Sequence, residues 1–148
     1  MKKKLTTRSE NMARIKSSNT KPELFIRKLM YRHGYRYRVN YERVPGKPDI
    51  FMNKHNTAIF VNGCFWHMHQ NCKRAVMPKT NTEYWQKKLM RNTERDRRNY
   101  KKINDLGFQV IVVWECTVKK FLKKDADLDI LFQQIENAVK SDCIFTEL

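Results

Sequence analysis

The 148-residue sequence contains few residues that interrupt regular structure, with only four glycines and four prolines. It has no Gly/Ser-rich linker and no internal repeat, so nothing divides it into two units. Its length suits one domain with one core. We therefore expect a single folded domain over residues 20–141, with an N-terminal arm at 1–19 and a tail at 142–148.

Long hydrophobic runs are also absent, because no apolar segment approaches the roughly 20 residues that span a bilayer. The basic start, Met1–Leu5, is followed by polar residues rather than by the apolar region of a signal peptide. Neither end carries a lipidation motif. We expect a cytoplasmic protein with no membrane partner, whose four cysteines are metal ligands or buried thiols rather than disulfides.

Acidic residues are scarce, with 15 Asp and Glu against 31 Lys and Arg and a formal net charge of +16. Such an excess favours a polyanionic partner, and nucleic acid fits better than a membrane. Charge alone leaves a ribosomal type of RNA-binding protein open. Several cations recur at helical spacing and would contact phosphates, although a solvated helix face would look similar. The cations assigned to this contact are Lys88, Arg91 and Arg95.

Hydrophobic periodicity predicts alternating helices and strands. The expected helices cover 9–16, 20–33, 80–106 and 128–139, and the expected strands cover 35–41, 49–52, 57–61 and 108–114. Thr20 with Glu23, and Thr80 with Glu83, have the spacing of capping boxes at helix starts. This order of elements predicts an α/β fold with a mixed central sheet flanked by helices.

Cys64, His69 and Cys72 lie within one short loop, and zinc prefers sulfur and imidazole ligands at tetrahedral spacing. Cys116 is our choice for the fourth ligand, because it follows a predicted strand whereas Cys143 lies in the tail. A zinc ion with four protein ligands would be structural. The alternative is that the cysteines are ordinary buried thiols and His69 is a solvated loop residue.

Asp49 follows a proline at the start of a strand, where a rigid main chain can present one carboxylate to magnesium. Val61 and Asn62 end the next strand and could offer carbonyl oxygens beside it. The second carboxylate and the lysine usual in nuclease strand pairs are missing. A simple Pro-Asp turn is the alternative.

His67 has no place in the proposed zinc set and is therefore a candidate general base or acid, or else a supporting or substitute zinc ligand. General acid–base help contributes roughly 10²- to 10⁴-fold, whereas phosphate ester hydrolysis needs much more. Magnesium at Asp49 could supply the remainder.

Phe65, Trp66 and Trp85 sit near the predicted ligands and cations. Large aromatics on a DNA-facing surface can insert between base steps and bend a duplex. The alternative is that they belong to the core.

Several short motifs occur along the chain: Arg8–Met12, Thr20–Glu23, Val44–Asp49, Asn62–His67, Glu94–Asp96 and Trp114–Cys116. In their order and spacing, from Arg8 to about Lys119, these motifs resemble the very-short-patch repair endonucleases. The resemblance implies a core related to the type II restriction enzymes of the PD-(D/E)xK group, with a structural zinc. It also implies magnesium-dependent nicking on the 5′ side of the thymine in T:G mismatches left by deamination of 5-methylcytosine.

By this resemblance, Asp49 matches a magnesium-binding aspartate, His67 a catalytic histidine, and Glu23 a helix glutamate near the site, a role that competes with helix capping. Asn62 stands where relatives often carry histidine or aspartate, in an auxiliary catalytic role. The zinc positions match, although the loop around Cys72 is a residue longer.

The three aromatics fall where the family intercalates side chains beside the mismatch, and Met12 falls on an arm that grips the duplex. The expected partner is double-stranded DNA with a T:G mismatch, together with mismatch-repair proteins, and we expect a monomer. Two rival functions remain at this point: a restriction-type nuclease that cuts paired duplex, and a noncatalytic zinc-braced DNA-binding module.

Overall fold

The centre of the fold is a pair of buried parallel strands, β3 (Thr57–Asn62) and β4 (Gln109–Trp114). In the computed structural model, which describes residues 18–123 and 127–148, they lie in a five-stranded sheet of order β1-β2-β3-β4-β5. β1 (Arg38–Val39) and β2 (Ile50–Met52) are antiparallel to their neighbours, and β5 (Phe145–Glu147) is parallel to β4. The sheet is therefore mixed, as the sequence predicts.

The two central strands are apolar on both faces because helices cover both faces. Side chains alternate across a strand. Ile59 and Ile111 therefore enter one core cluster, whereas Phe60 and Val112 enter another on the opposite face. The fold consequently has three layers, with the sheet in the middle.

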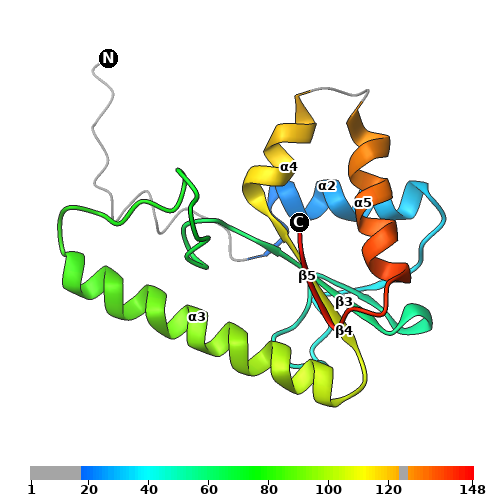
Figure 1. The fold of residues 1–148 in the computed structure, drawn as a ribbon, viewed down its shortest axis with the longest axis horizontal. Helices are drawn as coiled ribbons and strands as arrows, with labels where there is room; N and C mark the ends of the chain where they lie inside the picture. Colours follow the sequence, from blue (N-terminus) through cyan, green and yellow to red (C-terminus); the bar gives the residue numbers. More distant parts are fainter. Residues whose placement is uncertain (1–17, 124–126) are drawn as a thin grey trace.

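Three helices pack together on one face and one long helix crosses the other (Figure 1). The three helices are α2 (Lys21–Arg32), α4 (Glu115–Leu122) and α5 (Leu128–Lys140). The long helix is α3 (Thr82–Asp105), and its C-terminal part contacts β4 through the buried Ile103. None of the described helices has the length and apolarity required to cross a bilayer.

The predicted helix ends are partly correct. Thr20 caps α2 by accepting a hydrogen bond from the Glu23 amide (3.4 Å), but the Glu23 carboxylate accepts from the Asn19 amide rather than from Thr20. The predicted Thr80–Glu83 box is wrong, because α3 is capped at Asn81 in a left-handed conformation with no side-chain bond. The predicted C-terminal ends of these two helices agree with the structure, since Gly34 (φ +91°) and Gly107 (φ +89°) follow α2 and α3 in a left-handed backbone that ends each helix.

Three further segments differ from the sequence prediction. The strand expected at 35–41 is limited to β1, because Tyr35 packs into the helical core and donates its hydroxyl proton to Glu136 (2.8 Å). Helix α4 was not predicted, since it follows β4 with no side-chain cap. The segment that we expected to be a tail contains β5. This strand forms by pairing with β4, so its own residues give little indication of a strand. The helix expected at 9–16 lies outside the described residues.

Candidate active site and metal centre

The chemistry-bearing residues meet at one edge of the sheet. β3 and β4 are parallel, so Asn62 and Trp114 end side by side, and β2 is antiparallel to β3, so its start lies beside the end of β3. Asp49 immediately precedes β2, and the loop that contains His67 follows β3. The fold thus brings together residues far apart in the sequence.

Asp49 is held at this edge by the neighbouring strand. Its Oδ2 accepts a hydrogen bond from the Val61 main-chain amide at 2.7 Å. Burial raises the pKa of the Asp49 carboxyl to about 7; the Val61 bond opposes that rise, and the nearby Glu23 carboxylate adds to it. Because the N–H and C=O of a strand residue point to the same side, the Val61 carbonyl oxygen faces the same edge as the carboxylate.

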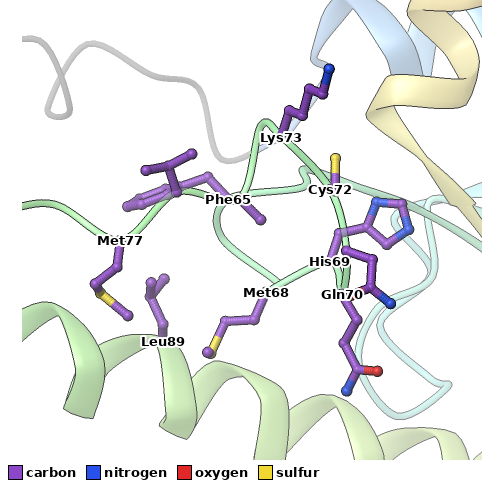
Figure 2. Close-up of a pocket in the computed structure, with 11 residues that line it drawn as sticks. Phe65, Met68, His69, Gln70, Cys72, Lys73, Met77 and Leu89 are labelled. Carbon is purple, nitrogen blue, oxygen red and sulfur yellow. The ribbon is translucent and has the colours of Figure 1, made fainter.

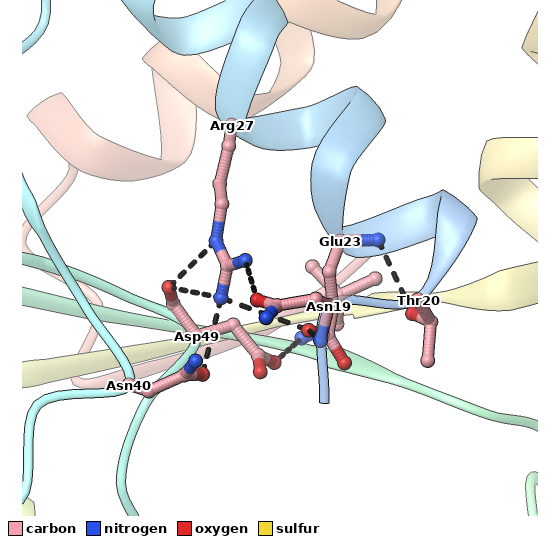
Figure 3. A network of polar contacts seen from close by, with 7 residues as sticks. Asn19, Thr20, Glu23, Arg27, Asn40 and Asp49 are labelled. Carbon is pink, nitrogen blue, oxygen red and sulfur yellow. Dashed lines mark hydrogen bonds and ion pairs between the residues drawn. The ribbon is translucent and has the colours of Figure 1, made fainter. Parts of the chain in front are cut away.

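A second buried carboxylate, Glu23, lies near Asp49 on the first turn of α2 (Figure 3). Glu23 pairs with the buried Arg27 at 3.6 Å, and Arg27 also donates to the Asp49 carbonyl oxygen. Two carboxylates therefore lie at one desolvated edge, and Arg27 pairs with that of Glu23 while it bonds only the main chain of Asp49. Such a site suits a hard divalent cation with oxygen ligands.

His67 is oriented by an acidic side chain from α3. Its Nδ1 lies 2.5 Å from Oδ2 of Asp96, and both side chains are partly buried. This contact assigns the proton of neutral His67 to Nδ1 and leaves Nε2 without a proton. A cavity of about 520 Å³ adjoins the pair, so space is available beside the imidazole.

Asp96 belongs to a polar row on α3 that faces the loop and the end of β3. Residues four apart share one face of a helix. Asn92 donates to the Trp66 carbonyl oxygen (3.1 Å), and one turn beyond Asp96 the Tyr100 hydroxyl accepts from the Asn62 side chain (2.8 Å). Burial is the main cause that raises the pKa of Tyr100, so its hydroxyl stays protonated. Three successive turns of α3 therefore hold the site residues in place.

Four soft donor atoms converge at the other end of the loop. The ligand atoms of Cys64, His69, Cys72 and Cys116 all lie within 4.8 Å of one another, and all four predicted residues are included. A tetrahedral zinc site with bonds of about 2.3 Å has sulfur atoms about 3.8 Å apart, so this spacing fits zinc. The cysteines are free thiols, and Cys143 is exposed.

The surroundings of these thiols shift the pKa values of Cys64 and Cys72 in opposite directions. Burial raises the pKa of Cys64 to about 12, whereas main-chain N–H groups, that of Arg74 first, lower the pKa of Cys72. The His69 ring stacks on Trp114 with centroids 4.0 Å apart. A bound metal would hold the Cys64 thiolate that burial alone disfavours.

The loop rests on α3 over an apolar cavity of about 440 Å³ (Figure 2). Met68, Met77 and Leu89 line its floor, and His69 and Cys72 mark its metal-cluster end. Around this cavity the loop contacts α3 through the His67–Asp96 and Trp66–Asn92 hydrogen bonds and through the packing of its aromatic side chains on Trp85.

The three predicted aromatics form one cluster next to the cationic face of α3. Phe65, Trp66 and Trp85 are in mutual edge-on contact, with ring centroids 5.2–6.0 Å apart. Trp85 is buried, so it supports the other two, which are only partly covered. The Lys88 ammonium lies 5.5 Å from the Trp66 ring, and Arg91 and Arg95 are exposed further along α3. Met12 lies outside the described residues.

Comparison with known proteins gives this arrangement a family. A family model described as "DNA mismatch endonuclease Vsr" matches residues 2–74. "Type II nicking enzyme V.NmeAIP" of Neisseria meningitidis is 43% identical over 89% of this chain and 94% of its own length. "DNA mismatch endonuclease Vsr" of Escherichia coli is 39% identical over 76% of this chain and 72% of its own length. The chain belongs to the Vsr family of DNA mismatch endonucleases.

Because the chain belongs to this family, it is a DNA endonuclease and its partner is DNA. This result excludes the RNA-binding protein and the noncatalytic DNA-binding module that the sequence left open. A third Vsr-type relative, "Type II nicking enzyme V.XorIIP" of Xanthomonas oryzae, is 39% identical over 71% of this chain and 76% of its own length. The sequence-predicted Vsr resemblance is confirmed.

Sequence reasoning assigned no role to several residues that the structure places in this Vsr site. Asp96 was noted only as part of a motif, although a signal was available: Asn92, Asp96 and Tyr100 are polar or amphipathic residues in line with the apolar stripe of Leu89 and Ile103. Arg27 was assigned no role, and nothing local in the sequence indicates that it is buried. The exposed Tyr84, which touches Trp85, was also missed.

Proposed function

We propose that this Vsr-family protein is a magnesium-dependent endonuclease that nicks duplex DNA on the 5′ side of the thymine in T:G mismatches. The observation that carries the proposal is the meeting of Asp49, the Val61 main chain and the His67–Asp96 pair at one edge of the sheet. Two relatives are named as a mismatch endonuclease and a nicking enzyme. The core would accordingly be of the restriction-endonuclease type.

Asp49 and the Val61 carbonyl oxygen would hold the magnesium ion. Their fit is supported by the desolvated carboxylate and by a main-chain oxygen that faces the same edge. When bound, magnesium would polarise the scissile phosphate and neutralise developing charge. With one carboxylate and one carbonyl from the protein, most coordination positions remain for water and phosphate oxygens, as magnesium prefers.

His67 would move the proton. Asp96 fixes the imidazole with its free Nε2 turned away from α3, so His67 can accept a proton from water or deliver one to the leaving oxygen. Glu23 would complete the charge balance around the magnesium ion from the first turn of α2. Asn62 would take an auxiliary role, with its amide held by Tyr100 and its position next to the Val61 ligand.

Zinc in the Cys64–His69–Cys72–Cys116 cluster would brace the loop rather than react. All four ligands come from the protein, so no position is left open for substrate. The loop places His67 between two of the ligands, Cys64 and His69. Zinc would therefore hold the loop main chain around His67, while Asp96 on α3 holds the imidazole ring.

The aromatic cluster would recognise the distorted pair. Phe65 and Trp66, supported by Trp85, would insert beside the mismatch, and Met12 on the N-terminal arm would contact the same duplex. Lys88, Arg91 and Arg95 would contact phosphates and supply affinity without sequence information. We also propose that the protein acts as a monomer alongside mismatch-repair proteins.

The test is nicking of end-labelled duplexes, T:G against fully paired, with magnesium or EDTA, in several sequence contexts of cytosine methyltransferases. The proposal expects magnesium-dependent cleavage of the thymine strand only, at the bond 5′ of the mismatched thymine. Cleavage of paired duplex at an equal rate would instead indicate a restriction-type nuclease. Cleavage at another bond would refute the proposed position.

A further inference from the structure

Arg27 is a buried cation on α2 for which the proposed reaction has no role. Only 6% of the residue is exposed, and arginine is rarely this buried unless it is paired. Its guanidinium contacts are polar: besides the Glu23 carboxylate on the same helix at 3.6 Å, they come from three other segments of the chain. Removing a cation from water costs free energy that its polar partners only partly offset, so the buried position of Arg27 calls for a physical account.

The guanidinium clamps the main chain at Asp49 (Figure 3). Its Nε and Nη2 donate to the Asp49 carbonyl oxygen at 3.2 and 3.1 Å, a two-pronged contact that only the planar fork of arginine can make. The Asp49 side chain is held separately by the Val61 amide at 2.7 Å. Asp49 is thus fixed at both its main chain and its carboxylate.

Two further hydrogen bonds of the guanidinium fix the clamp itself. Nη1 donates to the Asn19 side-chain oxygen at 2.7 Å, and Nη2 donates to the Asn40 side-chain oxygen at 3.1 Å. Asn19 and Asn40 both adopt left-handed backbone conformations (φ 55° and 45°) that turn the chain toward the guanidinium. Arg27 therefore joins α2, the turn after β1 and the start of β2.

We propose that Arg27 is a positioning residue for the metal site: its clamp on the Asp49 main chain sets where the carboxylate meets the divalent cation. The inference rests on the proposed metal site at Asp49. In this proposal Arg27 strengthens binding of the divalent cation, although its positive charge alone would weaken that binding. A nearby positive charge repels a dication, whereas loss of positioning weakens the site even when that repulsion is removed.

The experiment compares Arg27→Gln, Arg27→Lys and Arg32→Gln, the last being an exposed cation on the same helix. Mn²⁺ binding to the DNA-free, zinc-loaded protein is measured by electron paramagnetic resonance, with Asp49→Ala to identify the site. We expect Arg27→Gln to weaken Mn²⁺ binding by about 10-fold or more, as loss of a group that orients a metal ligand does. Arg27→Lys keeps the charge but lacks the fork, so it should weaken binding as well, and Arg32→Gln should bind like the wild type.

A folded Arg27→Gln variant that binds Mn²⁺ as tightly as the wild type, or more tightly, would overturn the inference while leaving the proposed function standing. Absence of any Asp49-dependent Mn²⁺ binding in the wild type, together with absence of nicking, would overturn the proposed function itself. If Arg27→Gln does not fold, Asn19→Gly and Asn40→Gly each remove one partner of the clamp and still tolerate the left-handed backbone. Both should then weaken Mn²⁺ binding at unchanged melting temperature, and unchanged binding in both would overturn the inference.

Discussion

The two candidate metal sites of this protein lie at the same edge of the sheet but are built in opposite ways. The Cys/His cluster offers four soft donors within 4.8 Å of one another, all from the protein. The Asp49 site offers one carboxylate, one main-chain carbonyl and a second carboxylate nearby. A closed site fixes structure, whereas an open site leaves room for substrate. The comparison assigns folding to the first site and chemistry to the second.

Loss of one cluster ligand should have the largest effect, and on stability. Cys116→Ser leaves three good ligands, and because metal binding here is folding free energy, we expect loss of zinc and a melting temperature lower by about 10 °C or more. Calorimetry with measurement of zinc content checks this. The matched control is Cys143→Ser, which removes an exposed thiol outside the cluster. Normal zinc content and stability in Cys116→Ser would contradict the assignment of a closed site.

His67 lies between the two sites and separates chemistry from structure. His67→Ala should slow nicking of a T:G duplex by roughly 10²- to 10⁴-fold, as expected for a general acid or base, while zinc content and duplex affinity stay unchanged. Single-turnover kinetics provide the rate. His55→Ala, on the exposed turn between β2 and β3, serves as the control. Zinc loss in His67→Ala would place this histidine in the cluster instead.

The Asp49 site, which is the open one of the two, should destabilise the folded protein when no magnesium is bound. Burial raises the folded-state pKa of Asp49 to about 7 from the ordinary 3.8, so ionised Asp49 opposes folding and stability falls as pH rises between those values. In magnesium-free, zinc-loaded protein, Asp49→Asn should raise the free energy of unfolding by up to about 4 kcal/mol near pH 8 and by less near pH 5.5.

Urea denaturation at both pH values measures this difference, with Asp105→Asn on exposed α3 as the control. Magnesium should stabilise the wild type at pH 8 and leave Asp49→Asn unchanged. An Asp49→Asn variant less stable than the wild type at both pH values would mean that the carboxylate has a structural role.

Asp96 should give the smallest of these effects. Asp96→Asn keeps the shape of the side chain but accepts a weaker bond from His67 Nδ1, so we expect nicking to slow by about 10- to 100-fold. The magnesium concentration at half-maximal rate should not change, because Asp96 does not contact Asp49. A shift of that concentration with an unchanged maximal rate would indicate that Asp96 acts on the magnesium site rather than on His67.

Local patterns in the sequence predict the central architecture and most of the cluster. Alternation and apolar runs identify β3, β4 and α3, since these elements bury their own side chains. Cys64, His69 and Cys72 are found by spacing within one loop. Cys116 is found because it follows a buried strand, which places it near another strand's end.

The remainder depends on contacts between distant segments. β5 forms only by pairing with β4, and the predicted strand at 35–41 is shortened because Tyr35 packs against α5 instead of a neighbouring strand. The roles of Arg27 and Asp96 follow from partners 22 and 29 residues away. No local pattern specifies which cation is buried or which acid meets the histidine.

The most direct test of the division between the two metal sites is magnesium titration of T:G-duplex nicking by zinc-loaded wild type and zinc-loaded Asp49→Ala. The account predicts no nicking by the wild type before magnesium is added and a saturable rise afterwards. Asp49→Ala should bind the duplex and hold zinc but stay at least about 10³-fold slower at every magnesium concentration. Full-rate nicking with zinc alone, or normal magnesium saturation in Asp49→Ala, would contradict it.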